Sequence, residues 1–247
     1  LRTALAAVEE RTPDDGGPAL REALADECAL WLETPETAGG AGAEGLVLRL
    51  PDRAGCARPL LEGPQAVEQG EAILVHGWSE TVARGLELAH ARGLAPEVVV
   101  SEGGPDLGGR RMARRLVASG MRVRFVYDAA LVDSVRRVDR VWLGTEAIGA
   151  SGFLGRVGTR GLLERARDLD VPSAVLATSD KLVPGGEVAP PEWAGDEPWH
   201  LWEGAPRDVT VESQSFEVVP VGLVDAFATE MGVMSAGELA VRGLRLG

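Results

Sequence analysis

This 247-residue sequence contains one lysine and two cysteines. The few cysteines argue against a zinc site or a disulfide framework, and the single lysine is a candidate site residue. The two cysteines, Cys28 and Cys56, are 28 positions apart, which matches neither a zinc site nor a redox pair and makes a disulfide framework improbable. No other motif indicates a metal or cofactor, so we expect neither. Lys181 is the single lysine, and we follow it as a candidate site residue.

The sequence also has no long apolar run and no surplus of basic residues. No run approaches the roughly 20 apolar residues of a membrane-spanning helix, and the N-terminus lacks the charged-then-apolar pattern of an export signal. A formal net charge of −13 disfavours nonspecific binding to nucleic acid, which needs a basic surface. We therefore expect a cytoplasmic protein without a membrane partner or a direct nucleic-acid partner.

Two regions with different patterns follow one another along the chain. Residues 1–65 are predicted to form a small, mainly helical N-terminal part with a glycine-rich linker, and residues 66–247 a Rossmann-like C-terminal domain. In the second region short apolar strands alternate with helices, which is typical of an α/β fold with a parallel sheet covered by helices on both faces.

The apolar patterns place the elements of this domain. Strands are predicted at residues 72–75, 98–100, 123–127, 141–143 and 174–177. Helices are predicted at residues 80–91, 110–119, 129–135 and 159–169, and near 221–231 and 236–244. Residues 183–207, rich in proline, glycine and tryptophan, are predicted to form a long loop that its three tryptophans partly pack.

The segment Ser101-Glu102-Gly103-Gly104-Pro105-Asp106-Leu107-Gly108-Gly109 joins a predicted strand to a predicted helix. Such a glycine-rich turn leaves backbone N–H groups free at a helix start, which suits an anion such as phosphate. Turns of this kind are common and many bind nothing, so both interpretations stay open for this segment alone. Similar turns follow the other predicted strands.

Ligands of open α/β sheets bind beyond the carboxyl ends of the strands, so the strand-end turns hold the candidate residues. We predict that ligand-binding residues include His76, Gly77, Ser79, Gly104, Arg156, Gly158, Thr159, Lys181 and Glu217. Catalytic residues, if the protein is an enzyme, would be Glu146, Asp128 and Glu102.

Several of these residues have a structural alternative. His76 fits an acid–base role or a buried, hydrogen-bonded strand end, and Asp128 fits a helix cap. Carboxylates from Glu102, Asp128, Glu146 and Glu217 would raise one another's pKa if they met at one rim, unless Arg156, Lys181 or a ligand paired with them. Spacing alone does not establish that they meet.

Taken in order, these motifs resemble a family that contains the alpha, beta and delta subunits of translation initiation factor 2B, methylthioribose-1-phosphate isomerase and ribose-1,5-bisphosphate isomerase. The resemblance covers residues 66–247 and rests on Ile73-Leu74-Val75-His76, Ser101-Glu102 with Pro105, Asp128-Ala129-Ala130, Gly144-Thr145-Glu146 and Gly155-Arg156-Val157-Gly158-Thr159. It implies a helical N-terminal part, a Rossmann-like C-terminal domain and a homodimer or larger assembly through that domain.

The sequence departs from the isomerases of this family at the positions that carry their chemistry. The resemblance places a catalytic cysteine at Gly77, an aspartate at Glu146 and an arginine at Gly104, and an asparagine–lysine pair at Gly155-Arg156. Glutamate at position 146 is typical of the initiation-factor branch. Losing one proton-transfer group costs roughly 10²–10⁴ in rate, so the departures argue against the same reaction.

Three hypotheses follow. The first is a non-catalytic protein resembling initiation factor 2B, which binds a sugar phosphate or nucleotide phosphate at the strand ends and acts through assembly. The second is an aldose–ketose isomerase of a phosphorylated ribose derivative, with Glu146 as base and Glu102, Asp128 or His76 as acid. The third is a structural homologue without a working pocket. We favour the first.

Overall fold

The computed structural model describes residues 52–63, 66–183, 186–190, 201–202 and 204–243, which belong to one compact unit, Pro51–Gly247. Residues 1–51 of the predicted helical N-terminal part, with its glycine-rich linker, lie outside the described residues. Within the described part, no helix is long and apolar enough to span a membrane.

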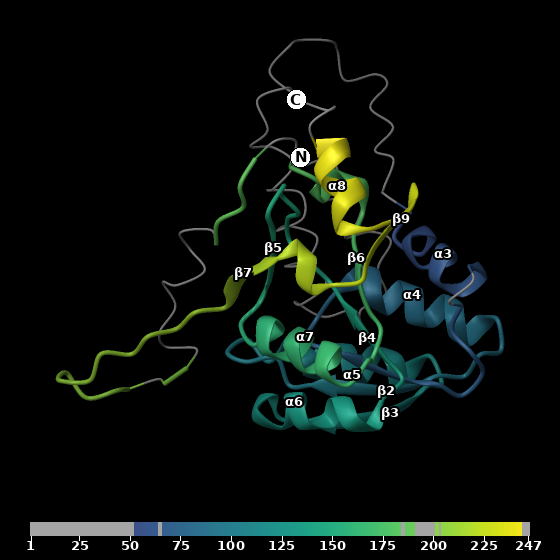
Figure 1. The fold of residues 1–247 in the computed structure, drawn as a ribbon. Coiled ribbons are helices and arrows are strands. Elements are labelled where there is room, and N and C mark those ends of the chain that lie inside the picture. Colours follow the sequence, from purple (N-terminus) through teal and green to yellow (C-terminus); the bar gives the residue numbers. More distant parts are fainter. Residues whose placement is uncertain (1–51, 64–65, 184–185, 191–200, 203, 244–247) are drawn as a thin grey trace, which may run out of the picture. The chain divides into compact units, whose positions relative to one another are not determined.

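A seven-stranded sheet forms the centre of this unit, with strand order β3-β2-β1-β4-β6-β8-β9 (Figure 1). All neighbouring pairs are parallel except β8 with β9. The strands are β1 (Ala72–Val75), β2 (Glu97–Ser101), β3 (Arg122–Val126), β4 (Arg140–Leu143), β6 (Ser173–Leu176), β8 (Ala226–Thr229) and β9 (Gly232–Met234). The first six have the order of a doubly wound dinucleotide-binding sheet, which confirms the predicted fold class.

Helices cover both faces of the sheet. They are α3 (Arg58–Glu62), α4 (Glu80–Ala91), α5 (Gly108–Ala118), α6 (Leu131–Ser134), α7 (Thr159–Asp168) and α8 (Ala236–Gly243). Each strand contributes side chains to the hydrophobic clusters on both faces, because successive side chains of a strand point to opposite sides. Leu74 packs in the cluster of α6, α7 and α8, whereas Ile73 and Val75 pack in the cluster of α3, α4 and α5.

Helix α5 comes unusually close to the sheet. A Cβ atom added at Gly109 would lie 1.7 Å from the backbone oxygen of Ser101, at the end of β2. The Gly109 N–H also donates to the Glu102 carbonyl oxygen at 2.8 Å. Glycine at this position therefore draws the first turn of α5 against the end of β2, close to the other strand ends.

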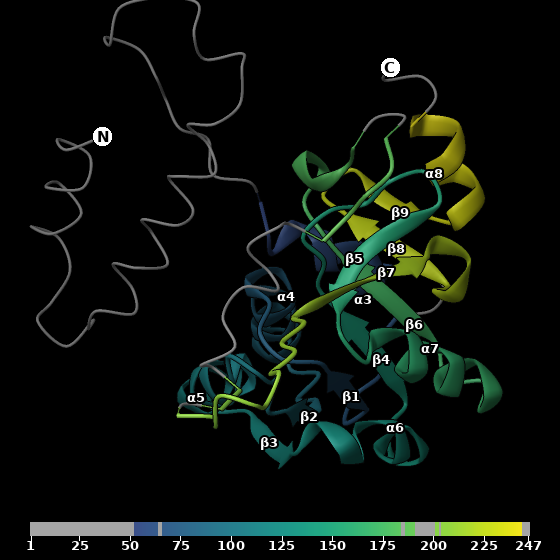
Figure 2. The same cartoon turned by 90° about the vertical axis from the view of Figure 1, so that its left-hand side faces the viewer.

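A second, two-stranded sheet lies beside the first and consists of β5 (Gly152–Arg156) and β7 (Phe216–Pro220). The two strands are antiparallel, with Arg156 opposite Phe216, and Figure 2 shows them next to each other. Neither segment is among the predicted strands, and in β5 glycines 152 and 155 are more typical of a turn. This sheet carries Arg156 and Glu217.

The predicted helix near residues 221–231 is wrong. These residues form a short 3₁₀ helix, Val221–Leu223, and then strand β8, Ala226–Thr229. Phe227 and Ala228 are fully buried, in the clusters on opposite faces of the sheet. A strand buried on both faces has a continuous apolar run, which periodicity does not distinguish from a helix.

Two smaller expectations also change. The predicted helix at residues 129–135 is a single α turn, α6, between two 3₁₀ turns, Asp128–Ala130 and Val135–Arg137. In the loop after β6, Trp193 and Trp199 lie outside the described residues, and Trp202 is 52% exposed rather than packed. The described residues of that loop contain no helix or strand apart from the 3₁₀ turn Ser179–Lys181 at its start.

Candidate functional site

Strand order reverses between β1 and β4, since β2 lies on the far side of β1 and β6 on the far side of β4. Open α/β sheets bind ligands in the crevice at such a switch point. A cavity lies there, lined by residues from five strand-end and helix-start segments: His76, Trp78, Ser79, Leu143, Gly144, Thr145, Glu146, Leu154, Arg156, Thr159 and Phe216. Its volume is about 20 Å³, room for about one water molecule.

Arg156, the last residue of β5, lines this cavity. Its two terminal nitrogens donate to the two carboxylate oxygens of Asp106, at 2.9 and 2.7 Å. The Arg156 side chain is 14% exposed and the Asp106 side chain 47% exposed. A guanidinium group binds planar oxyanions in this two-bonded geometry, and here its partner is the carboxylate of the protein's own Asp106.

His76 follows β1 and is buried, with 3% of its side chain exposed. Its Nδ1 lies 3.4 Å from Thr159 Oγ1, and its Nε2 lies 3.9 Å from Asp128 Oδ1. Burial lowers the pKa of His76 from 6.5 to about 4; Asp128 opposes this change and Arg156 adds to it. The imidazole is therefore neutral at pH 7, where one ring nitrogen donates a hydrogen bond and the other accepts one.

Asp128 holds the glycine-rich turn after β2. Its carboxylate oxygens accept from the backbone N–H groups of Gly103 and Gly104, at 2.9 and 2.7 Å. The Asp128 side chain thus links this turn to the ring of His76. The Gly103 and Gly104 N–H groups of this segment are therefore already bonded within the protein. Asp128 does not cap the helix that follows it, since neither the 3₁₀ turn Asp128–Ala130 nor α6 has a side-chain cap.

Gly77 adopts φ +68, a left-handed conformation that side chains disfavour. A Cβ atom added there would lie 2.8 Å from Arg156 Cδ and 2.9 Å from Arg156 Nε. The position at which the family resemblance implies a cysteine is therefore filled by the stem of Arg156. The Gly77 N–H donates to Ser101 Oγ at 3.2 Å, which ties this turn to β2.

Glu146 and Lys181 form a pair at the rim of the cavity. Lys181 Nζ donates to the Thr145 carbonyl oxygen at 2.7 Å and to Glu146 Oε2 at 3.3 Å. The Glu146 side chain is 54% exposed. Lys181, the single lysine of the chain, therefore binds the turn after β4 and pairs with the carboxylate of Glu146, which the sequence analysis names as a candidate base.

Ser79 and Thr159 place hydroxyl groups at the N-termini of two helices, α4 and α7. Ser79 Oγ caps α4 by accepting from Val82 N–H at 3.3 Å, and Thr159 is the first residue of α7. Gly158 precedes it with φ +98, and a Cβ there would lie 3.5 Å from His76 Cε1. Glu217 lies outside the cavity lining, where it accepts from the Arg160 N–H at 2.9 Å.

The four carboxylates do not meet at one rim. Among them only Glu146 lines the cavity, since Asp128 binds the glycine turn, Glu217 binds the start of α7, and Glu102 is absent from the lining. Of the twelve residues predicted for the site, five line the cavity: His76, Ser79, Glu146, Arg156 and Thr159. Gly77, Gly104, Asp128, Gly158 and Lys181 contact those residues or support them.

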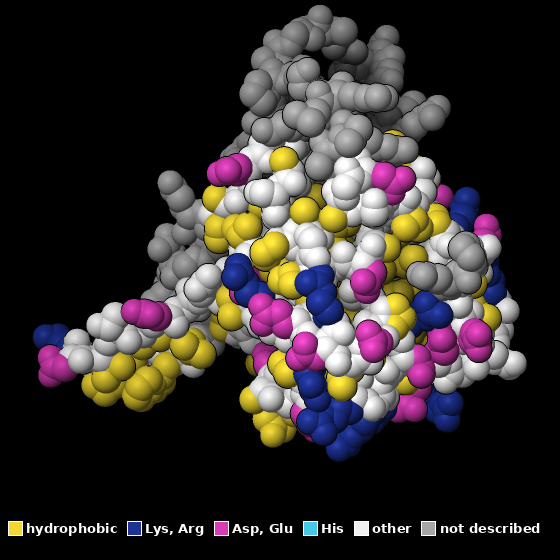
Figure 3. Space-filling model, in the orientation of Figure 1, with side chains coloured by type: hydrophobic (Ala, Val, Ile, Leu, Met, Phe, Trp, Pro, Cys, Tyr) yellow, Lys and Arg dark blue, Asp and Glu magenta, His cyan; other side chains and the backbone are white. Residues whose placement is uncertain are grey.

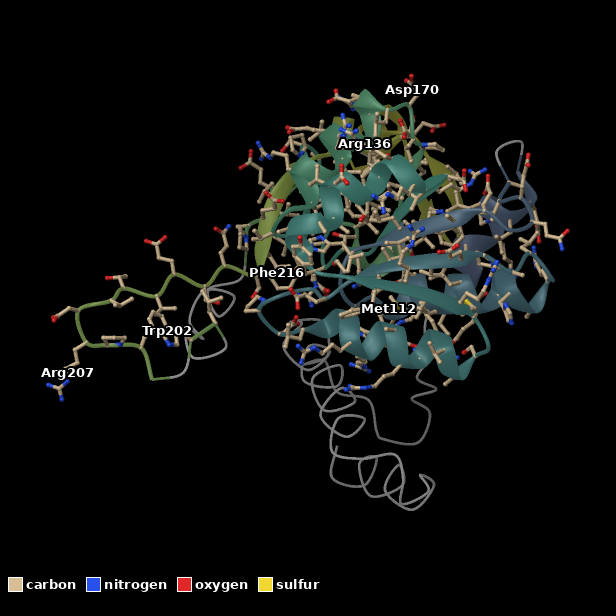
Figure 4. All side chains as sticks on the ribbon, turned by 90° about the horizontal axis from the view of Figure 1, so that it is seen from below. Met112, Arg136, Asp170, Trp202, Arg207 and Phe216 are labelled. Carbon is tan, nitrogen blue, oxygen red and sulfur yellow. The ribbon has the colours of Figure 1, made fainter. Side chains whose placement is uncertain are left out.

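Sequence reasoning overlooked three side chains of this site. Asp106 forms hydrogen bonds with the guanidinium group of Arg156, and Trp78 lines the cavity. The centre of the Phe216 ring lies 5.7 Å from the Arg156 guanidinium carbon, and Figure 4 labels Phe216. Asp106 belongs to the glycine-rich segment 101–109, so its carboxylate could have been recognised from the sequence as a partner for a nearby arginine. Phe216 follows a loop, and its approach to Arg156 depends on the pairing of β5 with β7.

Fold and site define a Rossmann-like protein with a small cavity at its switch point, lined by an arginine that binds an aspartate of the same protein. The chain belongs to the initiation factor 2 subunit family, whose model matches residues 60–236. This finding confirms the resemblance drawn from the motifs.

Two curated relatives carry isomerase names. Methylthioribose-1-phosphate isomerase of Cronobacter sakazakii is 31% identical over 233 residues, covering 85% of this chain and 68% of the relative. Ribose 1,5-bisphosphate isomerase of Haloferax volcanii is 31% identical over 179 residues, covering 69% of this chain and 54% of the relative. The chain therefore spans about two thirds and about half of these proteins.

A solved structure shares the fold. The translation initiation factor eIF-2B of Pyrococcus horikoshii OT3 superposes with a TM-score of 0.64 at 24% identity, over 74% of this chain and 63% of that chain. At this identity the likeness concerns the fold alone. The curated relatives include both isomerases and, at 26% identity over 192 residues, the translation initiation factor eIF2B subunit alpha of Dictyostelium discoideum.

Proposed function

We propose that this protein binds a phosphorylated pentose or a nucleoside monophosphate in the cavity between the ends of β1 and β4. The observation that carries the proposal is the Arg156–Asp106 pair, because a cavity-lining guanidinium already binds a carboxylate with two hydrogen bonds. A phosphate offers the same arginine a stronger charge and matching oxygens. The names of the isomerase relatives support a phosphorylated sugar as the ligand class.

Binding requires Asp106 to leave. The cavity of about 20 Å³ is far smaller than the ~300 Å³ or more of a typical ligand site. Asp106 is half exposed and sits in the turn before α5, so its carboxylate can turn into water once its bonds to Arg156 and to the Gly108 N–H are broken. Once Asp106 has moved, Ser79 and Thr159 supply hydroxyl groups and His76 a neutral ring for the hydroxyl groups of a sugar.

Ligand binding is tested by thermal shift and calorimetry with ribose 5-phosphate and AMP. A ligand at about 100 times its dissociation constant adds about 2.7 kcal/mol to the free energy of unfolding. Arg156→Gln should weaken binding on the order of tenfold or more, since a hydrogen-bonded charge contributes about 1.5–3 kcal/mol. Arg136→Gln, which removes an exposed arginine of a remote 3₁₀ turn, should leave binding unchanged. Equal affinities in all three proteins would refute the proposal.

A second candidate is an aldose–ketose isomerase. That reaction moves one proton between neighbouring carbons and another between their oxygens, so it needs a base and an acid. Neutral His76 and the half-exposed Glu146 both line the cavity, which favours this candidate. The isomerase names of the two curated relatives favour it too. Against it, no thiol is present at Gly77, and Lys181 holds Glu146 in an ion pair.

Proton NMR in D₂O separates the two candidates. The protein is incubated with methylthioribose 1-phosphate and with ribose 1,5-bisphosphate, and the appearance of ketose signals and of deuterium at the exchanging carbon is followed. Turnover that Glu146→Gln abolishes would establish the isomerase. Binding without turnover would support a protein that acts through its ligand-bound state.

The homodimer that the family resemblance implies is part of this proposal. The segment before β7 carries exposed apolar side chains, which we take as the surface for this contact. They are Leu201 at 59%, Trp202 at 52% and Val209 at 42% exposure. Figure 3 shows hydrophobic side chains gathered on this segment, and Figure 4 marks Trp202 and Arg207 on it. Light scattering of the wild type and of Trp202→Ser measures the assembly, and a monomeric wild type would remove this part of the proposal.

A further inference from the structure

Strand β3 is the outermost strand of the central sheet, and no strand in the described part of the chain pairs with its far side. Val126 bonds to the neighbouring strand β2, since its carbonyl oxygen accepts from the Glu102 N–H at 2.8 Å. Successive residues of a strand direct their backbone groups to opposite sides. The N–H and C=O groups of Val123 and Phe125 therefore point away from β2, which leaves this side open to another extended chain.

Two exposed aromatic side chains lie along this open side. Phe125 is 45% exposed and Tyr127 is 63% exposed. Both share a face of the sheet with Val123, because side chains two residues apart point the same way. Val123 packs in the cluster of α3, α4 and α5, so the two rings lie on the α5 side of β3. Val117 of α5 adds a third apolar side chain, 59% exposed.

Helix α5 borders the same side of the sheet, and one stripe of it carries arginine. Arg115 faces α4, because its guanidinium binds two carboxylates of that helix. Arg110, Arg114 and Val117 follow at spacings of four and three residues, which places them on one stripe. This stripe lies about 100° or more around the helix from Arg115, so it faces away from α4 and toward the outside of β3. We call β3, Tyr127 and this stripe the β3 edge.

The β3 edge is basic. Strand β3 contains Arg122 and Arg124 and no acidic residue, and Arg124 forms an ion pair with Glu97 of β2 at 3.2 Å. Arg110, Arg114 and Arg122 are exposed and form no ion pair with any residue that the structure describes. Figure 3 shows Lys and Arg side chains gathered at the lower end of this unit, where Figure 1 places β3. In a chain with a net charge of −13, this end is a local basic surface.

An extended acidic peptide matches the β3 edge better than other partners do. Its backbone alternates N–H and C=O groups as the open strand does, whereas a nucleic acid offers no such row of groups. A second copy paired through the same edge would bring its Arg122 and Arg124 against these two residues, and opposed like charges are destabilising. The unpaired arginines favour carboxylates on the partner, and the exposed rings favour apolar side chains between them.

We propose that the β3 edge binds an extended acidic segment of a partner protein, which adds to the sheet as a further strand outside β3. The backbone of this segment pairs with Val123 and Phe125. Its carboxylates bind Arg114 on one face and Arg122 on the other, and its apolar side chains pack on Phe125 and Tyr127. The β3 edge is separate from the cavity between β1 and β4, so this proposal stands independently of the proposed ligand.

The test measures the affinity of two fluorescein-labelled peptides for the full chain by fluorescence anisotropy. One peptide alternates glutamate with valine over about ten residues, and the other has glutamine in place of each glutamate. The glutamate peptide should bind at least about fivefold more tightly, since one exposed ion pair contributes a factor of up to about five. Arg114→Gln/Arg122→Gln should reduce this preference to about half or less. Equal affinities of the wild type for both peptides would overturn the proposal.

A matched double variant removes the same charge from other parts of the surface. Arg137→Gln/Arg207→Gln changes two exposed arginines, one in the 3₁₀ turn after α6 and one in the segment before β7. Figure 4 labels Arg207 on that segment, away from Met112 of α5. The preference for the glutamate peptide should stay at the wild-type value. An equal loss in this variant and in Arg114→Gln/Arg122→Gln would show that net charge alone attracts the peptide, which contradicts a defined edge.

Hydrogen exchange tests the added strand itself. With saturating glutamate peptide, the amides of Val123 and Phe125 should exchange at least about tenfold more slowly in isotope-labelled protein, because their N–H groups become hydrogen-bonded. Phe125→Thr keeps a residue that favours strands but removes the ring, so it should weaken binding of the glutamate peptide severalfold. Unchanged exchange at both amides would refute strand addition.

Two further probes separate a strand from other anionic partners. A peptide that alternates glutamate with proline keeps the charge but cannot pair as a strand, so it should bind at least about fivefold more weakly than the glutamate–valine peptide. Equal binding of these two peptides would contradict the proposal. Tighter binding of a single-stranded oligouridylate of about ten nucleotides would overturn it in favour of a nucleic-acid partner.

Discussion

Arg156 on β5 and Asp106 before α5, 50 positions apart in the chain, are joined by two hydrogen bonds of 2.9 and 2.7 Å beside the cavity. The pair connects the two-stranded sheet to the central sheet's strand-end loops. Asp106 also accepts from the Gly108 N–H at 3.1 Å, so the same carboxylate is bonded to the first turn of α5.

Asp106→Asn should strengthen phosphate binding. The neutral amide competes less well for Arg156, so the ligand no longer displaces a charged partner. An ion pair with one exposed member contributes at most about 1 kcal/mol, which corresponds to a gain of up to about fivefold in affinity for ribose 5-phosphate. Calorimetry measures the gain. Asp133→Asn, which alters an exposed aspartate paired with Arg136, is the control and should change nothing. Weaker binding by Asp106→Asn would mean that Asp106 helps to hold the ligand.

Gly77→Ala should destabilise the protein and weaken ligand binding together. A left-handed backbone costs a non-glycine residue about 1–2 kcal/mol, and the new methyl group would displace the Arg156 stem. Urea unfolding measures the first effect and calorimetry with ribose 5-phosphate the second.

Gly93→Ala separates these two effects. Gly93 has φ +83, and a Cβ there would have no atom within 4 Å. This variant should lose similar stability and keep the wild-type ligand affinity. If Gly77→Ala also kept the wild-type affinity, the stem of Arg156 would have no part in binding.

Lowering the pH should destabilise the protein through His76. Its pKa is about 4 in the folded state and 6.5 when it is not buried, so the unfolded chain binds the extra proton first. This contribution to stability is complete above pH 6.5 and is lost as the pH falls toward 4. At pH 5.5 the loss is on the order of 1 kcal/mol.

Urea unfolding at pH 7 and pH 5.5 checks the effect of His76. The decrease in unfolding free energy should be smaller in His76→Gln than in the wild type, whatever the absolute stability of the variant. Equal decreases in both proteins would show that His76 is not the titrating group.

Local patterns were sufficient for the elements with strong signals. Strand β1 and helix α4 have the predicted bounds, because a four-residue apolar run ends at His76 and Ser79 caps the helix that follows. The strand-end rule also directed attention to His76, Ser79, Glu146, Arg156 and Thr159, which line one cavity. Parallel strands with short turns bring these positions to one edge, so sequence order was enough to find them.

Pairing between distant segments was beyond those patterns. Strand β8 looked like a helix because its apolar run has no period of its own once both faces are buried. Strand β5 looked like a turn because it contains Gly152 and Gly155, and only its pairing with β7, 60 residues later, makes it a strand. Arg156 reaches Asp106 through this pairing.

The sequence by itself determined that this is a doubly wound α/β protein of its family, without a thiol at position 77, because those properties depend on local runs and on single residue identities. Only the tertiary structure decided what each charged group does. In the folded protein Asp128 accepts hydrogen bonds from the glycine turn after β2, Glu146 pairs with Lys181, and Asp106 pairs with Arg156. The reason is that a charge is neutralised by whichever partner the fold brings within about 3 Å, and that distance is set by strand pairing across the molecule.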